Sequence, residues 1–172
     1  FAPMSVTVCL EDEVDVSRGN MLVPPSHPPH VTRCIDARLV WMDHKPLDLR
    51  RQYIIKHTTQ WVKAQVRYVR YRVDVNSFQR HPASELKLNE IGTVVIDMHS
   101  PLFVDQYRRN RATGSFILVD PISNATVAAG MITGRDPKMA DSAIQEMQVS
   151  ESKHISQPDR QKRIGHASVL VW

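Results

Sequence analysis

The chain is poor in the residues that brace or activate small domains. Among its 172 residues only 2 are cysteine and 6 are glycine. Cys9 and Cys34 lie far apart and form no CxxC pair. The sequence therefore favours two reduced thiols over a disulfide framework or a cysteine zinc site, and we expect a cytoplasmic protein.

Phosphate-binding and catalytic motifs are also missing. The sequence contains neither GxxxxGKS/T nor GxGxxG, and its dispersed glycines build no phosphate cradle. No GxSxG elbow frames a serine, and only His27 and His30 of the 8 histidines lie close together. We therefore assign no catalytic residue, no bound cofactor and no metal ligand to this chain.

Long apolar runs are absent as well. No segment approaches the roughly 18 apolar residues that cross a bilayer, and the N-terminus lacks a signal-peptide pattern, so we expect no membrane contact. The 22 Lys and Arg against 18 Asp and Glu give a net charge of +4. This modest excess is compatible with a nucleic-acid partner but does not require one.

What the chain does have is a series of β-type runs after the proline-rich connector PPSHPP at 24–29. Polar turns separate the runs 34–42, 52–57, 61–75 and 91–98, and we expect Ser100 and Pro101 to open a loop. MSVTVCL at 4–10 alternates like a half-buried strand, and Gly19 suits a turn with positive φ. This spacing predicts an antiparallel sandwich or a closed barrel.

The most distinctive stretch runs from Asn110 to Ile132. Its apolar runs 115–119 and 125–132 flank the polar connection Asp120 to Asn124. This pattern predicts a hairpin, and the hairpin contains no catalytic group.

The third run combines basic charge with aromatic rings. The interval from Leu49 to Val73 has no acidic residue and contains Arg50, Arg51, Lys56, Lys63, Arg67, Arg70, Arg72, Tyr53, Trp61, Tyr68 and Tyr71. One interpretation is a free-standing RNA-binding β-barrel that uses residues 50–72. The interpretation we favour is a strand face that pairs with acidic strands or another domain, with Arg67, Arg70 and Arg72 as interface candidates. Because one side changes from apolar to basic along the run, we also expect a bulge or twist within it.

The C-terminal part differs in composition from the rest. Residues 133–165 are polar and charged, with a short helix expected around 138–148, and HASVLVW at 166–172 is apolar and β-prone. The chain begins at Phe1 and its last apolar run stops without a turn, so we expect a fragment of a longer protein.

Several segments resemble one enzyme family. LEDEVDVSRGNML at 10–22 resembles the end of the second domain of the large, GTP-binding subunit of bacterial sulfate adenylyltransferase. The third domain of that subunit is similar to the segments ARLVWM (37–42), PLDLRRQYIIKHTTQWVKAQV (46–66), RVDVN (72–76), LNEIGTVVI (88–96) and 110–132. KRIGHASVLVW at 162–172 resembles the entry into an adenylylsulfate kinase domain.

The resemblance implies an all-β fold, a closed antiparallel β-barrel like the third domain of elongation factor Tu, followed by a flexible C-terminal linker. It implies the end of a second barrel at 1–26, the third-domain barrel at 27–134, the linker at 135–163 and the first strand of a truncated kinase domain at 164–172.

The same resemblance implies a non-catalytic role for this chain. The parent enzyme converts ATP and sulfate to adenylylsulfate and uses GTP, ATP and Mg²⁺, all bound outside this chain. The implied partners are the GTPase and second domains of the same protein and a small catalytic subunit.

Overall fold

The computed structural model describes residues 4–11 and 13–134, and these residues contain strands but no helix. The strands are β1 (His30–Trp41), β2 (Gln52–His57), β3 (Gln60–Val73), β4 (Arg80–His81), β5 (Ile91–Val104), β6 (Ser115–Val119) and β7 (Thr126–Gly134). The predicted linker (135–163), its helix and the predicted kinase strand (164–172) lie outside the described residues. The predicted hairpin is formed by β6 and β7.

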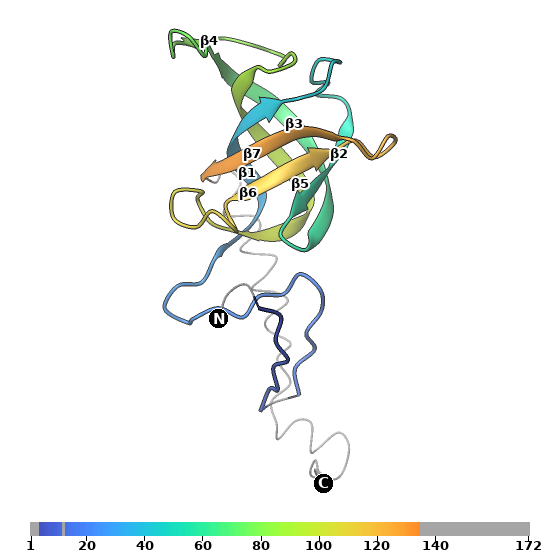
Figure 1. Ribbon diagram of the computed structural model, residues 1–172, viewed down its shortest axis with the longest axis vertical. Helices are drawn as coiled ribbons and strands as arrows, with labels where there is room; N and C mark the ends of the chain where they lie inside the picture. Colours follow the sequence, from blue (N-terminus) through green and yellow to red (C-terminus); the bar gives the residue numbers. More distant parts are fainter. Residues whose placement is uncertain (1–3, 12, 135–172) are drawn as a thin grey trace.

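The strands form one sheet that closes on itself. Their order is β2-β6-β7-β1-β5-β3-β4, and β2 also pairs with β3, which joins the two sides of the sheet into a barrel (Figure 1). Every pairing is antiparallel, and the two-residue β4 adds to β3 outside the closed ring. The prediction of a closed antiparallel barrel is confirmed.

The interior is filled by alternate side chains of these strands. The largest fully buried residues include Trp41, Ile35, Leu39, Ile55, Ile96, Leu102 and Leu118 of the strands and Leu86 of the β4–β5 connection. Burying one such apolar side chain contributes roughly 1.5–3 kcal/mol, so this cluster supplies the main stabilisation of the barrel. His57 is also buried, and burial lowers the pKa of its imidazole although the carbonyl of Thr113 accepts a hydrogen bond from it at 2.8 Å.

The expected irregularity in the basic run is present as two bulges in β3. The register against β5 shifts between Val66 and Tyr68 and again between Val69 and Tyr71. Arg67 and Arg70 are the extra residues at these two points. A bulge reverses the inside–outside alternation, which is why Val66 and Val69 are both buried although they are three positions apart.

The expected loop at Ser100 and Pro101 is wrong, because β5 continues to Val104. Thr32 of β1 pairs with Leu102 of β5, whereas Cys34 pairs with Asp97. The register therefore shifts here, and residues 98–101 of β5 have no partner in the β1 ladder. Pro101 falls in this bulge, where the ladder needs no backbone donor, so proline is tolerated inside the strand.

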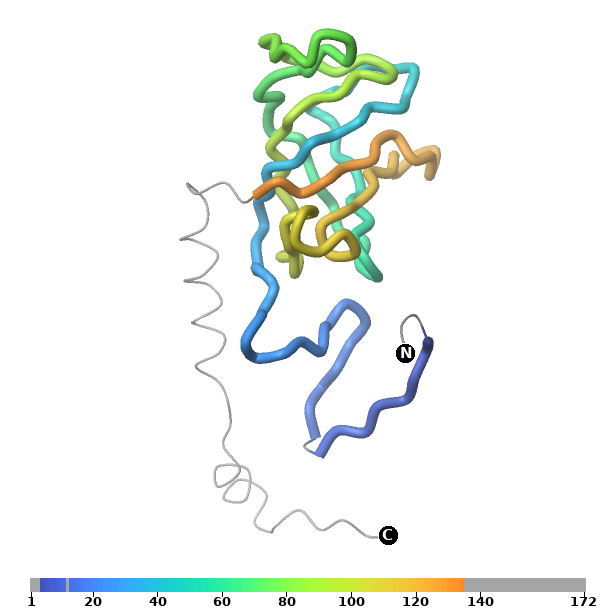
Figure 2. The backbone as a smooth tube through the Cα atoms, turned by 60° about the vertical axis from the view of Figure 1, so that its left-hand side comes forward, coloured from blue at the N-terminus to red at the C-terminus, as the bar shows by residue number. Residues whose placement is uncertain are grey.

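The strand expected at 4–10 is also not formed. Residues 4–11 and 13–29 contain no strand, and Val6 and Val8 are 69% and 56% exposed. An alternating run becomes a strand only when it pairs with another strand, and no strand of the described residues pairs with this segment. Residues 4–11 and 13–29, called the 4–29 segment below, lie at one end of the barrel (Figure 2). Its turn at Gly19 has the expected positive φ of 105° and touches β3, because the side-chain amide of Gln60 donates to the Gly19 carbonyl at 3.0 Å.

Close packing between β6 and β7 yields a first prediction. A Cβ on Gly130 would lie 2.2 Å from the buried ring of Phe116, whereas a Cβ on Gly134 of the same strand would meet nothing within 4 Å. Because overpacking a core costs about 1–3 kcal/mol, Gly130→Ala should lower the free energy of unfolding by that amount in urea titrations. Gly134→Ala is the matched control, and an equal effect of the two changes would contradict the packing argument.

Candidate functional site

The three arginines singled out in the sequence lie on β3 and each contacts a carboxylate. Arg67 pairs with Asp97 of β5 at 2.8 Å, and Arg70 pairs with Asp36 of β1 at 2.8 Å. Arg72 pairs with Glu90, which immediately precedes β5. The two bulges aim Arg67 and Arg70 across the sheet toward these acids.

These ion pairs are close to the surface. The side chains of Arg67, Arg70 and Arg72 are 42%, 37% and 41% exposed. Exposed pairs of this kind contribute about 0–1 kcal/mol each, so they orient the guanidinium groups more than they stabilise the barrel. Burial opposes ionisation of Glu90, but its hydrogen bonds with the Lys87 amide and Arg72 lower the pKa of this carboxyl overall.

The structure divides the basic interval of the sequence into separate surfaces. Arg51 pairs with Asp120 instead of lying beside the β3 arginines. Lys56 lies over the ring of Trp61, 5.0 Å from its centroid, on the β2–β3 hairpin. The interval therefore forms no single continuous basic track.

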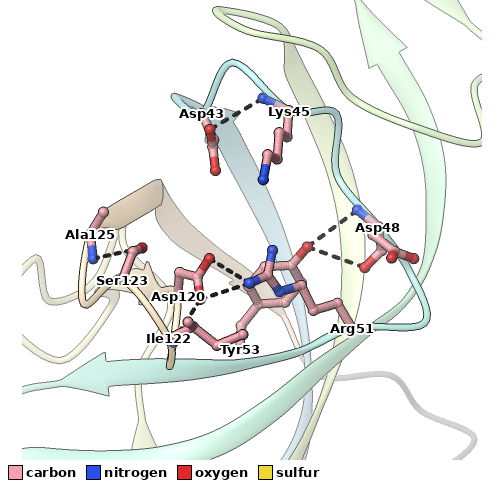
Figure 3. A network of polar contacts seen from close by, with 9 residues as sticks. All are labelled: Asp43, Lys45, Asp48, Arg51, Tyr53, Asp120, Ile122, Ser123 and Ala125. Carbon is pink, nitrogen blue, oxygen red and sulfur yellow. Dashed lines mark hydrogen bonds and ion pairs between the residues drawn. The ribbon is translucent and has the colours of Figure 1, made fainter.

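A second polar cluster lies where the β1–β2 connection meets the β6–β7 turn (Figure 3). Here Arg51 donates to both carboxylate oxygens of Asp120, at 2.9 and 2.7 Å. The pair lines an open hollow of about 480 Å³ whose other lining residues are Met42, Asp43, Lys45, Ile122, Ser123, Ala125, Thr126 and Val127. Two segments that are 69 residues apart in the sequence are thus held together at one place.

Asp120 is the organising group of this hollow. Its Oδ1 accepts a hydrogen bond from the Ile122 amide at 2.8 Å, and the backbone of the turn closes through Asn124 N–H to Asp120 O at 2.9 Å. The Ile122 amide is the largest cause of a lowered pKa at Asp120, and Arg51 acts in the same direction against the effect of burial. The carboxylate therefore remains ionised at neutral pH.

Two aromatic residues hold the β1–β2 connection, which contributes Met42, Asp43, Lys45 and Arg51 to the lining of the hollow. The Tyr53 hydroxyl donates to the Asp48 carbonyl and accepts from the Asp48 amide, both at 3.2 Å. Burial raises the pKa of Tyr53, so its hydroxyl keeps the proton that it donates. The Trp41 indole donates to the Lys45 carbonyl at 2.7 Å and packs edge-on against Tyr53.

The chemistry of these clusters suits binding and positioning. Asp120 and Arg51 neutralise each other. Ser123 of the hollow contacts Asp120 through its backbone amide, while its hydroxyl accepts from the Ala125 amide at 3.4 Å. No group of three or more His, Cys, Asp or Glu residues in the described ranges could hold a metal ion. A search of the same ranges found no helix long and apolar enough to span a bilayer.

The Arg51–Asp120 pair was not predicted from the sequence. The sequence places Asp120 in a polar turn and Arg51 in the basic interval, but nothing in it indicates that the two residues pair.

The pairing of the described strands defines an all-β module, a closed antiparallel barrel. The family described as "GTP-eEF1A C-terminal domain-like" matches residues 34–133, and the chain belongs to this family. The solved structure of sup35 complexed with GDP is similar in fold, with a TM-score of 0.58 and 14% identity over 65% of this chain and 28% of that one.

Sequence identity is higher to proteins named sulfate adenylyltransferase subunit 1 and bifunctional enzyme CysN/CysC. The chain is 49% identical over 138 residues to sulfate adenylyltransferase subunit 1 of Bacteroides fragilis, covering 80% of this chain and 29% of that protein. It is 45% identical over 150 residues to the bifunctional enzyme CysN/CysC of Rhodopirellula baltica, covering 87% of this chain and 23% of that protein. The bifunctional enzyme CysN/CysC of Mycobacterium tuberculosis H37Rv is 47% identical over 134 residues, covering 77% of this chain and 22% of that protein. The chain thus spans less than a third of these curated relatives, and the expected family resemblance is confirmed.

The second prediction concerns the Arg51–Asp120 pair. Asp120→Asn can still accept from the Ile122 amide but loses the charge opposite Arg51. The pKa of Asp120 is lower in the folded protein than its ordinary value of about 4. The ionised carboxylate therefore stabilises the fold at any pH above about 4, and this stabilisation is lost as the pH falls through the pKa of the folded state.

The variant should therefore melt at a lower temperature at pH 7, and its melting temperature should change less than that of the wild type below about pH 4. Thermal melts followed by circular dichroism from pH 7 to pH 2.5 test this. Glu85→Gln is the control, because Glu85 is exposed and lies 3.9 Å from Lys87. Parallel pH profiles for wild type and Asp120→Asn would contradict the role of the ion pair.

Proposed function

We propose that this chain is the barrel part of a GTP-dependent sulfate adenylyltransferase large subunit and that it acts in domain and subunit contacts. The observation that carries the proposal is the 49% identity over 138 residues to sulfate adenylyltransferase subunit 1. In this proposal the whole enzyme forms adenylylsulfate from ATP and sulfate. GTP, ATP and Mg²⁺ bind outside this chain, which supplies no catalytic residue.

The partners follow from the same proposal. They are the GTPase and second domains of the same protein and the small catalytic subunit, with assembly in the cytoplasm. Similarity to proteins named bifunctional CysN/CysC supports a further kinase domain, entered at 164–172 after a linker at 135–163. We place the end of the second barrel at 1–26 and the third-domain barrel at 27–134.

Ion pairing on β3 favours this proposal over RNA binding. Arg67, Arg70 and Arg72 each have a carboxylate within ion-pair distance. A surface that tracks a nucleic-acid backbone needs a net positive charge, and the three acids offset the charge of these arginines. Their guanidinium groups stay partly exposed and can still contact a protein partner.

The third prediction tests the activity of the whole protein. The complete gene product should form adenylylsulfate from ATP and sulfate only together with the other sulfate adenylyltransferase subunit of the same organism, and GTP should increase the rate. Coupled detection of pyrophosphate release, with and without GTP, measures this. Activity of either protein alone, or no activity of the mixture, would contradict the proposal.

The fourth prediction tests the arginines of β3. Arg67→Gln with Arg70→Gln in the complete protein should weaken its affinity for the other subunit severalfold. Folding should be retained, since the lost pairs are exposed. Asp97→Asn with Asp36→Asn is the matched control, because it breaks the same pairs but keeps both guanidinium groups. Analytical ultracentrifugation measures the affinity, and equal effects of the two double variants would exclude a direct contact of the arginines with a partner.

A further inference from the structure

The turn between β3 and β4 presents two apolar side chains to solvent. Phe78 is 80% exposed and Val75 is 54% exposed. The turn stands at the end of the barrel opposite the 4–29 segment in both views of the chain (Figures 1 and 2). A single exposed apolar residue is common on protein surfaces, so the way in which this ring is held carries the argument.

Hydrogen bonds to the side chain and backbone of one aspartate, Asp74, stabilise the turn. Oδ1 of Asp74 accepts from the amides of Asn76 at 2.8 Å and Ser77 at 2.9 Å. The Phe78 amide donates to the Asp74 carbonyl at 2.8 Å, and the Asp74 amide donates to the Gln79 carbonyl at 3.0 Å. The amides of Ser77 and Asn76 lower the pKa of Asp74, so the carboxylate remains an acceptor at neutral pH. The ring is therefore presented on a rigid base.

The backbone at Phe78 is strained. Its φ of 56° lies in the left-handed region, which glycine adopts freely and a bulky side chain adopts at a cost. Because the ring is 80% exposed, it gives the core almost nothing in return. Strain of this kind in an ordered turn is a reason to look for a function outside the fold.

The neighbouring cation indicates the chemistry of the partner. Arg80 lies over the ring of Tyr71, 4.7 Å from its centroid. Among the described residues no carboxylate forms an ion pair with Arg80, in contrast to the three arginines of β3. An aromatic anchor beside an arginine is typical of protein–protein hot spots. A complementary partner offers an apolar pocket for Phe78 with a carboxylate at its rim for Arg80.

We propose that Phe78 is the anchor by which this barrel docks on the other sulfate adenylyltransferase subunit, with Arg80 pairing to a carboxylate of that subunit. The inference rests on the proposed function. It gives a reason for both the strained backbone and the exposed ring, because the partner's pocket buries an aromatic side chain that is already held in the binding conformation. Preorganisation of this kind reduces the entropy lost on association.

The fifth prediction compares variants of the complete protein in binding to the purified other subunit, measured by calorimetry. Phe78→Ala and Phe78→Gly should each weaken binding at least tenfold, as expected for a hot-spot anchor. Phe78→Gly should also melt at or above the wild-type temperature, because glycine relieves the left-handed strain. Arg80→Gln should have a smaller effect of the same sign.

Trp61→Ala is the matched control. Trp61 of β3 is 54% exposed, so its removal deletes another exposed aromatic side chain away from the β3–β4 turn and should change affinity less than twofold. Binding of both Phe78 variants within twofold of wild type would overturn the inference while leaving the proposed function intact. Failure of the wild-type protein to bind the other subunit would overturn both. Saturable binding of single-stranded oligouridylate that Phe78→Ala abolishes would show that the anchor serves RNA and would also overturn the inference.

Discussion

The fold depends on the pairing of β2 with β3, which closes the sheet. β2 has six residues, and all of them pair with β3 while three also pair with β6. Without this pairing both strands would present open edges, and the interior residues Tyr53 and Ile55 would lose one wall of their surroundings. Closure also fixes the volume inside the barrel. Large and small residues must then match inside it, as the Phe116 ring of β6 does against the paired Gly130 of β7.

Closure explains why the β3 arginines lie where they do. A long strand that follows a small barrel must bend, and two bulges provide the bend at Arg67 and Arg70. Each bulged residue lies outside the regular ladder and turns toward an acid of another strand, Arg67 toward the adjacent β5 and Arg70 beyond it toward β1. The surface charge pattern of β3 is thus a consequence of the geometry that closes the barrel, and it is available to a partner without any cost to the core.

Alternation and turn residues were enough to predict most of the strands, whereas the choice of a closed barrel over a sandwich came from the family resemblance. β2 was predicted at its observed bounds, and the hairpin of β6 and β7 was recognised because its polar turn separates two apolar runs. The extension of β5 through Pro101 could not be predicted, since a proline is tolerated there only because of a bulge that depends on β1. The Arg51–Asp120 pair and the ion pairs of β3 also required the three-dimensional arrangement, because their partners are distant in sequence. For the Phe78 turn a signal did exist: an aspartate followed at two and three positions by Asn76 and Ser77 is typical of a side-chain-capped turn.

Four described non-glycine residues have a positive φ, and they differ in whether this backbone strain serves the fold. Asn89 and Asn124 belong to a residue type that tolerates this conformation in turns. Thr58 does not, but it lies in the tight connection between His57 and Gln60, which pair with each other, so its strain is the cost of joining the two strands that close the barrel. Phe78 has no comparable role, because β4 pairs with β3 through only two residue pairs and lies outside the ring. A glycine at position 78 would form the same turn at lower cost. Phe78 is therefore the strained described residue whose benefit we assign to the proposed contact outside the barrel.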